Sequence, residues 1–474
     1  MRWIAAHTWL LVLVLLVAGI LLCYHTHFPT NLLAATEVDY LDCDTLLCLH
    51  LMSEGQERSK TVRYTAQAID GSQLLLYLQK DSLPQPQMGD VLLVQTTVRR
   101  GDTIGEFDYG RYLRLQGLVG SAWACRRNWQ VIGHQPIRGL RAKAERCQIF
   151  LHRRYAALGL RGDDLAIFSA LTLGYREDLD KDLQQSFSAS GAMHILAVSG
   201  LHTGIVWGAI VFLLTLAGLL RPLYEQRCWQ FLLTLLTLFV LWTYAFVTGL
   251  SPSVMRSALM VTMVEVGWLF RRSSLGLNTL AAAAVIILLL NPLALWSVSF
   301  QLSFAAVASI LLVGTWWQRR VLLHGRVWRS IGGLLLMSFA AQIGTLPLTL
   351  HYFEQTSNYF ALTNLVVVPA AFGLLLLGLG SLAMSWCVVG GWLAAAAQAC
   401  TTGLRMFVEW IEHLPFATTH IDLSAPSVWC CYGAILCAVA MMYGEKVRWW
   451  WLVGVVACIM TALAYNTLPL HFPL

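Results

Sequence analysis

The chain has 474 residues, of which 57% are hydrophobic and only 12% are charged, and its formal net charge is +6. Soluble domains carry about 25% charged residues, so this composition excludes an ordinary soluble protein. It predicts a polytopic α-helical membrane protein with a smaller soluble part. The 19 tryptophans agree with this class, since such rings gather at the two membrane–water interfaces.

The first apolar stretch covers residues 9–24 and follows Arg2. No small-residue cleavage pattern comes after it, as a signal peptide would require. Residues 1–35 are therefore predicted to hold an N-terminal transmembrane helix that begins in the cytoplasm.

Residues 36–135 are polar and contain short runs with the pattern of strands. These runs are 62–69, 73–79, 91–98 and 118–125, and Asp70-Gly71 forms a tight turn between the first two. Several short strands within about 100 residues predict a small all-β domain, and an OB-like barrel fits them.

The positions of the cysteines limit which disulfides and metal sites the chain could form. Most of the 12 lie in apolar segments, as small buried hydrophobic residues do. Cys43 and Cys48 instead lie in a polar stretch, where an oxidising compartment would allow a disulfide between them. No Cys/His spacing resembles a zinc site, so we expect no metal and no cofactor.

Residues 136–190 form a linker that begins with a basic run. Within 137–161 the cations are Arg138, Arg141, Lys143, Arg146, Arg153, Arg154 and Arg161, against Glu145 alone. The apolar residues 149–151 make this run amphipathic, which predicts a helix on the membrane surface. Phosphate binding is the alternative for such a run.

Apolar segments follow one another through the last part of the chain, 191–474. They cover roughly 192–218, 229–247, 253–270, 277–290, 296–316, 330–350, 360–384, 391–409, 427–443 and 449–466. With the first helix they predict about eleven transmembrane helices. Lys and Arg gather in the loops 221–227, 271–272, 319–329 and 445–448. The positive-inside rule therefore places the β-domain and the C-terminus outside the cytoplasm.

Four polar clusters interrupt these apolar segments, and polar groups inside a bilayer indicate function. The candidate site residues are His194, Ser199, Gly200, His202, Gly204, Ser251, Pro252, Arg256, Gln301, Ser303, Asn358 and Asn364. Pro252 suits a helix start with Ser251 as its N-cap. The glycines, Gln301 and Ser303 also suit helix packing. Arg256 needs either an acid such as Glu265 or a phosphate.

The clusters, in this order, resemble the competence domain of the ComEC family of DNA-internalisation channels. The matching stretches are HILAVSGLH, GLSPSVMRSALM, NPLALWSVSFQLSFAAV and NYFALTNLVVVP. Residues 104–123, IGEFDYGRYLRLQGLVGSAW, are similar to the soluble N-terminal domain of that family. The resemblance implies an inner-membrane channel that takes single-stranded DNA into the cytoplasm during natural transformation, with the candidate residues lining the channel.

The resemblance also implies partners. Many members carry a metallo-β-lactamase-like nuclease domain, but this sequence has no H-x-H-x-D-H cluster. We therefore expect no enzymatic activity of its own. Either a separate nuclease supplies the single strands, the sequence is truncated, or this chain has another role. The expected partners are that nuclease and an extracytoplasmic DNA receptor. The sequence has no phosphate loop, so a cytoplasmic single-strand-binding or motor protein would supply the driving force.

The β-domain would contact the DNA, because single strands bind to basic grooves with aromatic platforms. The candidate DNA-binding residues are Arg63, Arg99, Arg100, Arg111, Arg126, Arg127, Tyr109 and Tyr112. Acidic residues offset these cations, and core packing is the alternative role of the tyrosines.

Two other classes of function stay open. One is a transporter of a small polar or lipid-linked solute, which internal repeats would favour. The other is a membrane-embedded hydrolase that uses Ser199 and His202, for which no acidic partner lies nearby in the sequence.

Overall fold

The computed structural model describes residues 42–57, 60–80, 85–100, 103–104, 107–137, 139–216, 227–269, 276–320, 325–443 and 453–461. These residues fall into two compact units. One lies within Thr8–Ile149 and Ile287–Trp296, and the other within Phe150–Ile286 and Ser297–Leu474. The helix predicted for 1–35 lies outside the described residues, and so do 221–226, 271–272 and 445–448, on which the predicted orientation depends.

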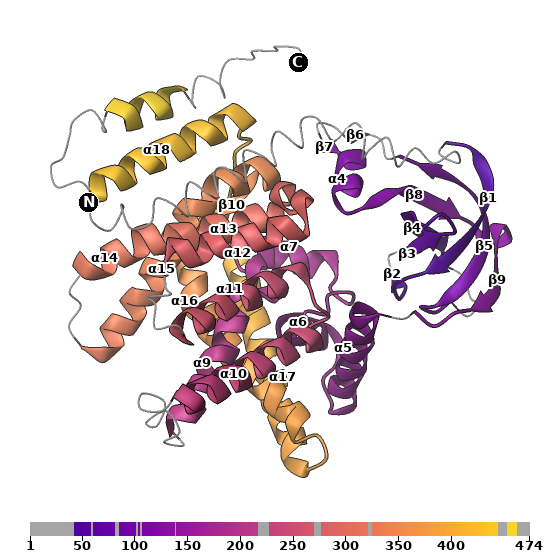
Figure 1. Ribbon diagram of the computed structural model, residues 1–474, viewed down its shortest axis with the longest axis horizontal. Coiled ribbons are helices and arrows are strands. Elements are labelled where there is room, and N and C mark those ends of the chain that lie inside the picture. Colours follow the sequence, from indigo (N-terminus) through magenta and orange to yellow (C-terminus); the bar gives the residue numbers. More distant parts are fainter. Residues whose placement is uncertain are drawn as a thin grey trace. The chain divides into compact units, whose positions relative to one another are not determined.

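Five strands of the first unit close into a barrel (Figure 1). They are β1 (Asp44–Leu51), β3 (Thr61–Ala68), β4 (Gln73–Gln79), β5 (Asp90–Arg99) and β8 (Leu118–Ala124). The order is β1-β3-β4-β8-β5, and β5 pairs back to β1. The β4–β8 pair is parallel and the other pairs of the barrel are antiparallel. The predicted OB-like barrel is confirmed.

Alternating side chains fill the barrel. Every second residue of β3 is buried, including Val62 and Tyr64, as expected where one face of a strand points inward. Burial raises the pKa of the Tyr64 phenol, which donates a hydrogen bond to the carbonyl oxygen of Pro86 at 3.1 Å. Gly71 has a φ of +86° in the predicted turn between β3 and β4, and Asp70 Oδ1 accepts from the Ser72 amide there.

The first unit also contains smaller elements outside the five barrel strands. They are β2 (Gln56–Glu57), β6 (Thr103–Ile104), β7 (Phe107–Asp108), α4 (Tyr109–Leu115), the 3₁₀ turn η1 (Arg126–Asn128) and β9 (Trp129–His134). β9 pairs with β5 and adds a strand beside the barrel.

The predicted disulfide between Cys43 and Cys48 is wrong, since both residues are free thiols. Cys43 directly precedes β1 and Cys48 lies within it. Five residues of extended strand span about 16 Å at about 3.3 Å per residue. A disulfide needs Cα atoms less than about 7 Å apart, so the strand itself keeps the two thiols from pairing.

Helices build the second unit, and α5 (Leu140–Ala157) crosses the boundary between the units. The unit contains α6 (Gly162–Leu173), α7 (Lys181–Ala189), α8 (Met193–Leu196), α9 (Gly200–Leu216), α10 (Arg227–Val247), α11 (Pro252–Leu269), α13 (Val298–Ser309), η4 (Ile310–Gly314), α14 (Thr315–Arg320), α15 (Arg326–Phe353), α16 (Phe360–Ala383), α17 (Val388–Glu412) and α18 (Ala425–Tyr443). Between α11 and α13 the chain forms α12 (Leu277–Leu290) and the 3₁₀ turn η3 (Pro292–Trp296).

Four helices of the described chain are long and apolar enough to cross a membrane, namely those at Trp229–Val247, Val327–Phe353, Phe360–Ala383 and Ala425–Tyr443. Shorter apolar helices cover Gly200–Leu214, Leu277–Leu290 and Val298–Gly314. The predicted apolar segments are thus helical where they are described, while the count of about eleven spans remains a prediction.

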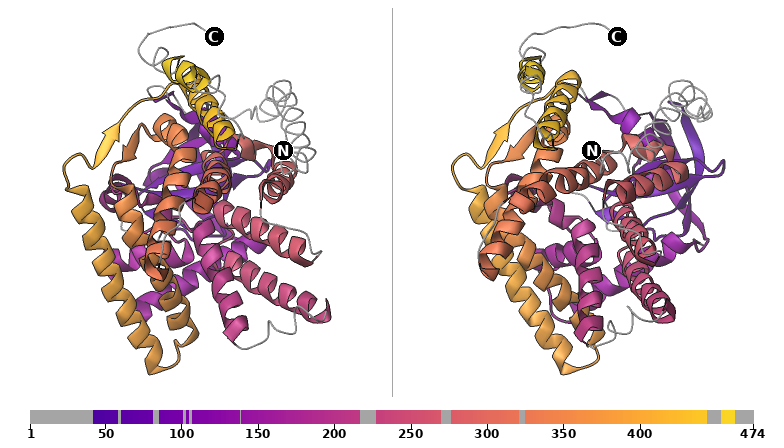
Figure 2. Two further views of the ribbon diagram at one scale, coloured as in Figure 1. Left: turned by 90° about the vertical axis from the view of Figure 1, so that its left-hand side faces the viewer. Right: turned by 60° about the vertical axis from the view of Figure 1, so that its left-hand side comes forward.

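Two apolar cores hold the helical unit together. In the first, α6, α7 and α8 pack against α16 and α17. In the second, α9, α10 and α11 pack together, with Leu375 of α16 buried among them. Helix α16 therefore lies between the two cores and fixes their relative position; Figure 2 shows it running beside α17.

A two-stranded sheet joins two loops that the sequence places on the same side of the membrane. β10 (Gln355–Ser357) pairs antiparallel with β11 (Thr418–His420), and both appear as short arrows in Figure 2. Loops that pair must lie on one face of a bilayer. This pairing therefore agrees with the predicted positions of 351–359 and 411–426.

Candidate functional site

A break divides the apolar segment 192–218, which the sequence pattern presents as one span. Helix α8 ends at Leu196 and α9 begins at Gly200. Ser199 Oγ accepts a hydrogen bond from the Leu201 amide at 3.3 Å, and the Ser199 amide donates to His202 Nδ1 at 3.2 Å. This is a capping box in which histidine replaces the usual Glu or Gln. The capping box makes α9 a new helix.

The capping box also sets the tautomer of His202. Because Nδ1 accepts from an amide, the ring proton lies on Nε2. His202 is wholly buried, and its Nε2 has no hydrogen-bond partner in the described part of the chain. A buried N–H donor is thus held at the start of α9, where the helix also favours negative charge.

The carboxyl end of α8 is held separately. Arg176, in the loop after α6, donates from Nε to the carbonyl oxygen of Leu196 at 3.0 Å. His194 is exposed and donates from Nδ1 to the carbonyl oxygen of Gly191 at 3.0 Å. The predicted site residues of this cluster therefore have different roles: His194 closes a turn, and His202 caps a helix.

Helix α9 packs closely on α11. Thr203 Oγ1 lies 2.7 Å from Ser257 Oγ, and a Cβ at Gly200 would lie 3.7 Å from the Ser257 Cβ. That is an ordinary contact distance, and a Cβ at Gly204 would have no described atom within 4 Å, so the packing interpretation of these glycines stays a prediction. Trp207 Nε1 donates to Glu265 Oε1 at 2.5 Å further along the same contact.

Arg256 is 6% exposed on the first turns of α11. It donates from Nη2 to Ser299 Oγ of α13 at 2.7 Å, while its buried Nε has no partner among the described residues. The alternative pairing with Glu265 is wrong, because nine residues of helix separate the two by about 13 Å and Trp207 binds that carboxylate. No carboxylate of the described chain lies within 4.0 Å of this guanidinium.

The other predicted site residues lie elsewhere in the helical unit. Helix α11 begins at Pro252, directly after Ser251, as predicted. Gln301 Oε1 accepts from the hydroxyl of Tyr352 at 2.9 Å, an exposed contact. Asn358 Nδ2 donates to the carbonyl oxygen of Phe416 at 2.7 Å and so joins β10 to the β11 loop. Asn364 has a buried Oδ1 that accepts no hydrogen bond from the described groups.

The predicted DNA contacts of the barrel have different surroundings where their side chains are described. Arg99, Arg100 and Arg127 are exposed, while Arg63 donates to Gln56 Oε1. Tyr109 packs against Leu75, Leu113 and Leu118, which supports the core-packing role. The side chains of Arg111 and Tyr112 lie outside the described ones, and Arg126 is exposed.

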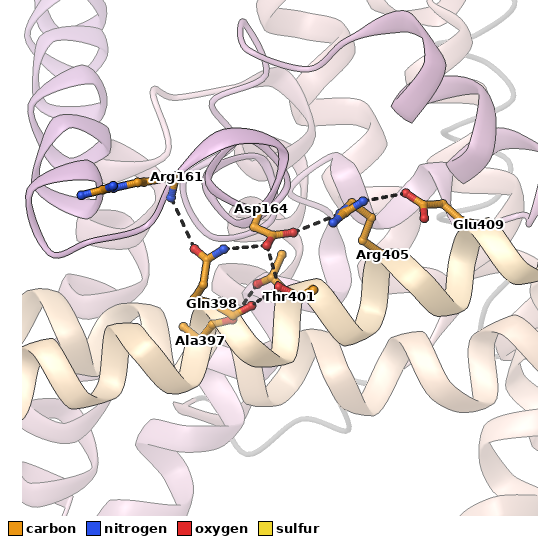
Figure 3. Close-up of polar contacts among 8 residues, drawn as sticks. Arg161, Asp164, Ala397, Gln398, Thr401, Arg405 and Glu409 are labelled. Carbon is orange, nitrogen blue, oxygen red and sulfur yellow. Dashed lines mark hydrogen bonds and ion pairs between the residues drawn. The ribbon is translucent and has the colours of Figure 1, made fainter.

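The sequence analysis missed a buried ionic cluster between α6 and α17 (Figure 3). Asp164 accepts from Gln398 Nε2 and Thr402 Oγ1 at 2.6 Å each, and from Arg405 Nε at 3.1 Å. Arg405 Nη1 also donates to Glu409 at 3.0 Å. Arg405 lies in an apolar segment, as Arg256 does, so the same rule should have singled it out.

Ser199 Oγ lies 3.2 Å from His202 Nδ1, which is the distance that a nucleophile and its base require. The Ser199 amide also donates to His202 Nδ1, and Ser199 Oγ also accepts from the Leu201 amide. In the described chain, no carboxylate orients the other ring nitrogen, Nε2. Among the described residues, His202 Nε2 and Arg256 Nε are also buried N–H donors without a hydrogen-bond partner, and such donors match an anionic ligand.

Comparisons with known proteins identify a family for more than half of the chain. The model of a family described as "Competence protein" matches residues 171–448. ComE operon protein 3 of Bacillus subtilis (strain 168) is 28% identical over 71% of this chain and 42% of its own length. Competence protein ComA of Neisseria gonorrhoeae is 25% identical over 66% of this chain and 48% of its own. Recombination protein 2 of Haemophilus influenzae is 29% identical over 48% of this chain and 29% of its own length.

The chain spans less than half the length of each of these relatives. No solved structure matches it.

Proposed function

Because the chain belongs to the competence protein family, we propose that it takes part in DNA uptake as an inner-membrane channel for single-stranded DNA. The proposal includes the multi-pass topology of about eleven helices, with the β-domain and the C-terminus outside the cytoplasm. The helices would form the path, and His202 and Arg256 would line it.

Arg256 carries this proposal. A charged side chain in a membrane segment needs a partner, and this guanidinium contacts only the neutral Ser299 hydroxyl among the described groups. A DNA strand has one negative charge per nucleotide. Its phosphates would pair with the guanidinium and would accept a hydrogen bond from its Nε, which has no partner among the described residues.

A path with few cations suits transport. Too many would trap the strand, because conduction requires contacts weak enough for the strand to leave. The two buried carboxylates of the described helical unit agree with this, since Asp164 and Glu265 are bound by other side chains. They would not compete with phosphate for Arg256.

The proposed partners are those of a strand-transfer pathway. A DNA receptor and a separate nuclease outside the membrane would deliver the single strand. A cytoplasmic single-strand-binding or motor protein would pull it through, since the sequence carries no phosphate loop.

A transporter of a small anionic solute is the second candidate. The break between α8 and α9 places a helix N-terminus inside an apolar segment, as discontinuous transporter helices do. Here the same donors would bind one anion at a time, and DNA uptake would not depend on them.

The decisive experiment measures DNase-protected uptake of labelled DNA by a competent host that lacks its own channel. The wild-type chain, supplied with a matched nuclease partner, is expected to restore uptake. Arg256→Ala should lower it about tenfold or more, since hydrogen bonds to charged groups contribute about 1.5–3 kcal/mol. Arg256→Lys should retain part of it, and Arg329→Ala, which removes an exposed cation of α15, should leave it unchanged.

Equal membrane levels of all variants make the comparison valid. Uptake that survives Arg256→Ala, with DNA-independent transport of a small anion lost instead, would favour the transporter. Absence of uptake from a correctly inserted wild type would overturn the channel.

A further inference from the structure

One face of helix α5 is exposed and combines cations with large apolar side chains. Its members recur at intervals of three or four residues, so they share one helix face. They are Leu140, Lys143, Arg146, Phe150 and Arg154. Leu140 is 66% exposed and Phe150 is 53% exposed, although both are apolar. Such side chains usually mark a binding surface when cations surround them.

A cavity of about 550 Å³ opens at the N-terminal end of this face. Its lining consists of Pro136, Ile137, Gly139, Leu140, Lys143 and Arg146. Arg146 donates from Nη2 to the carbonyl oxygen of Ile137 at 2.9 Å, which holds the guanidinium at the cavity wall. The cavity therefore has an apolar side and a cationic side.

The positive charge at this cavity is not paired with a carboxylate of α5. The helix has one carboxylate, Glu145, and that group pairs with Arg141 at 3.2 Å on the opposite side of the helix. Among the described residues, no carboxylate lies within 4.0 Å of Lys143 or Arg146. Two cations three residues apart thus remain available to an anionic ligand.

The buried residues of α5 argue against a membrane anchor at this surface. A helix that lies in a bilayer surface buries its apolar face in lipid and keeps its cations on the other face. Here the apolar side chains of Ala142, Ala144 and Tyr155 are buried within the protein and are not available to lipid. Cations and apolar groups alternate on the exposed face that holds Lys143 and Phe150, and Arg141 is exposed elsewhere on the helix.

We propose that this cavity binds a nucleotide unit of single-stranded DNA, in addition to the proposed path through the helices, and the proposal rests on that function. Lys143 and Arg146 bind the phosphodiester, and Leu140 with Pro136 forms the apolar wall against the base. Phe150 continues the surface as a stacking platform. The guanidinium carbon of Arg154 lies 5.2 Å from the centre of its ring, which adds a cation beside that platform.

The test measures binding of a labelled oligothymidylate of about 20 nucleotides to the full chain in nanodiscs of uncharged lipid, over a range of salt concentrations. Lys143→Gln should weaken binding roughly three- to tenfold at physiological salt. It should also reduce the slope of log affinity against log salt by about 0.7, the value for one phosphate contact with a single strand. Lys143→Arg should restore both quantities.

Arg141→Gln is the matched control, because it removes a cation from the opposite face of the same helix. Unchanged affinity and slope in Lys143→Gln would overturn the proposal, and so would equal losses in Arg141→Gln. Absence of oligothymidylate binding, with Lys143-dependent binding of anionic lipid vesicles instead, would assign the face to the membrane.

This test and the uptake test fail separately. Loss of binding in Lys143→Gln together with uptake that ignores Arg256→Ala would retain the nucleotide site and reject the path through Arg256. Unchanged binding together with Arg256-dependent uptake would do the reverse.

Discussion

Two buried charges of the helical unit have opposite surroundings. Asp164 receives hydrogen bonds from three side chains of α17, one of them the guanidinium of Arg405. Arg256 donates to a single hydroxyl. A buried ion stabilises a fold only when partners replace its lost hydration. Asp164 therefore serves the structure, whereas Arg256 is stabilised less by its surroundings and suits a ligand.

This contrast predicts opposite effects on stability. Asp164→Ala should destabilise the detergent-solubilised protein by about 3 kcal/mol, the cost of removing one partner from a buried pair. Arg256→Met should be neutral or stabilising, because it removes a buried charge that lacks a counterion, and it should abolish uptake. Thermal unfolding in one detergent measures both. If Arg256→Met destabilises as much as Asp164→Ala does, Arg256 is a structural residue.

Single residues were predictable from the sequence only in part. A charge in an apolar segment singles out Arg256, and the same rule applies to Arg405, which was missed. The partners of both came from far along the chain: Ser299 is 43 residues from Arg256, and Asp164 is 241 residues from Arg405. Sequence spacing does not predict contacts between residues so far apart. The sequence alone therefore left both an acidic residue and a phosphate as possible partners of Arg256.

At the level of elements, local patterns predicted most strands and helices. β3, β4, β5 and β8 coincide with the predicted runs to within one residue at each end. β1 was missed because Leu46, on its outer face, is 60% exposed and hides the alternation. β9 was missed because nearly all of its residues are exposed, so no alternation marks it. Hydropathy also hid the break between α8 and α9, since the segment is apolar on both sides.

The capping box at this break makes a testable claim about His202. His202→Gln keeps an acceptor for the Ser199 amide and a donor for a ligand, because S-x-x-Q is itself a capping box. The free energy of unfolding of His202→Gln should therefore lie within a few tenths of a kcal/mol of the wild-type value. That of His202→Leu should be lower by about 1 kcal/mol. Thermal unfolding of the two variants, compared at equal purity, decides this. Equal losses would show that His202 acts through its ring volume and not through the cap.

The whole molecule combines a barrel with helices that suit a bilayer, and its function depends on which side of the membrane the barrel faces. The β10–β11 pair shows that 351–359 and 411–426 share a side, but it does not identify that side. Composition and the positive-inside rule supply the direction, through basic loops that lie largely outside the described residues. Orientation is therefore the part of the proposal that most needs a direct measurement.

Cys43 provides that measurement, because it is exposed and its thiol is free. A membrane-impermeant maleimide should label it in intact spheroplasts, since the barrel is proposed to lie outside the cytoplasm, and Cys43→Ser should remove the fast phase of this labelling. The partly buried Cys48 should react more slowly, as burial limits access to its thiol. Labelling that requires permeabilised membranes would put the barrel in the cytoplasm. DNA would then meet the helices first, and neither the barrel nor α5 could receive an incoming strand.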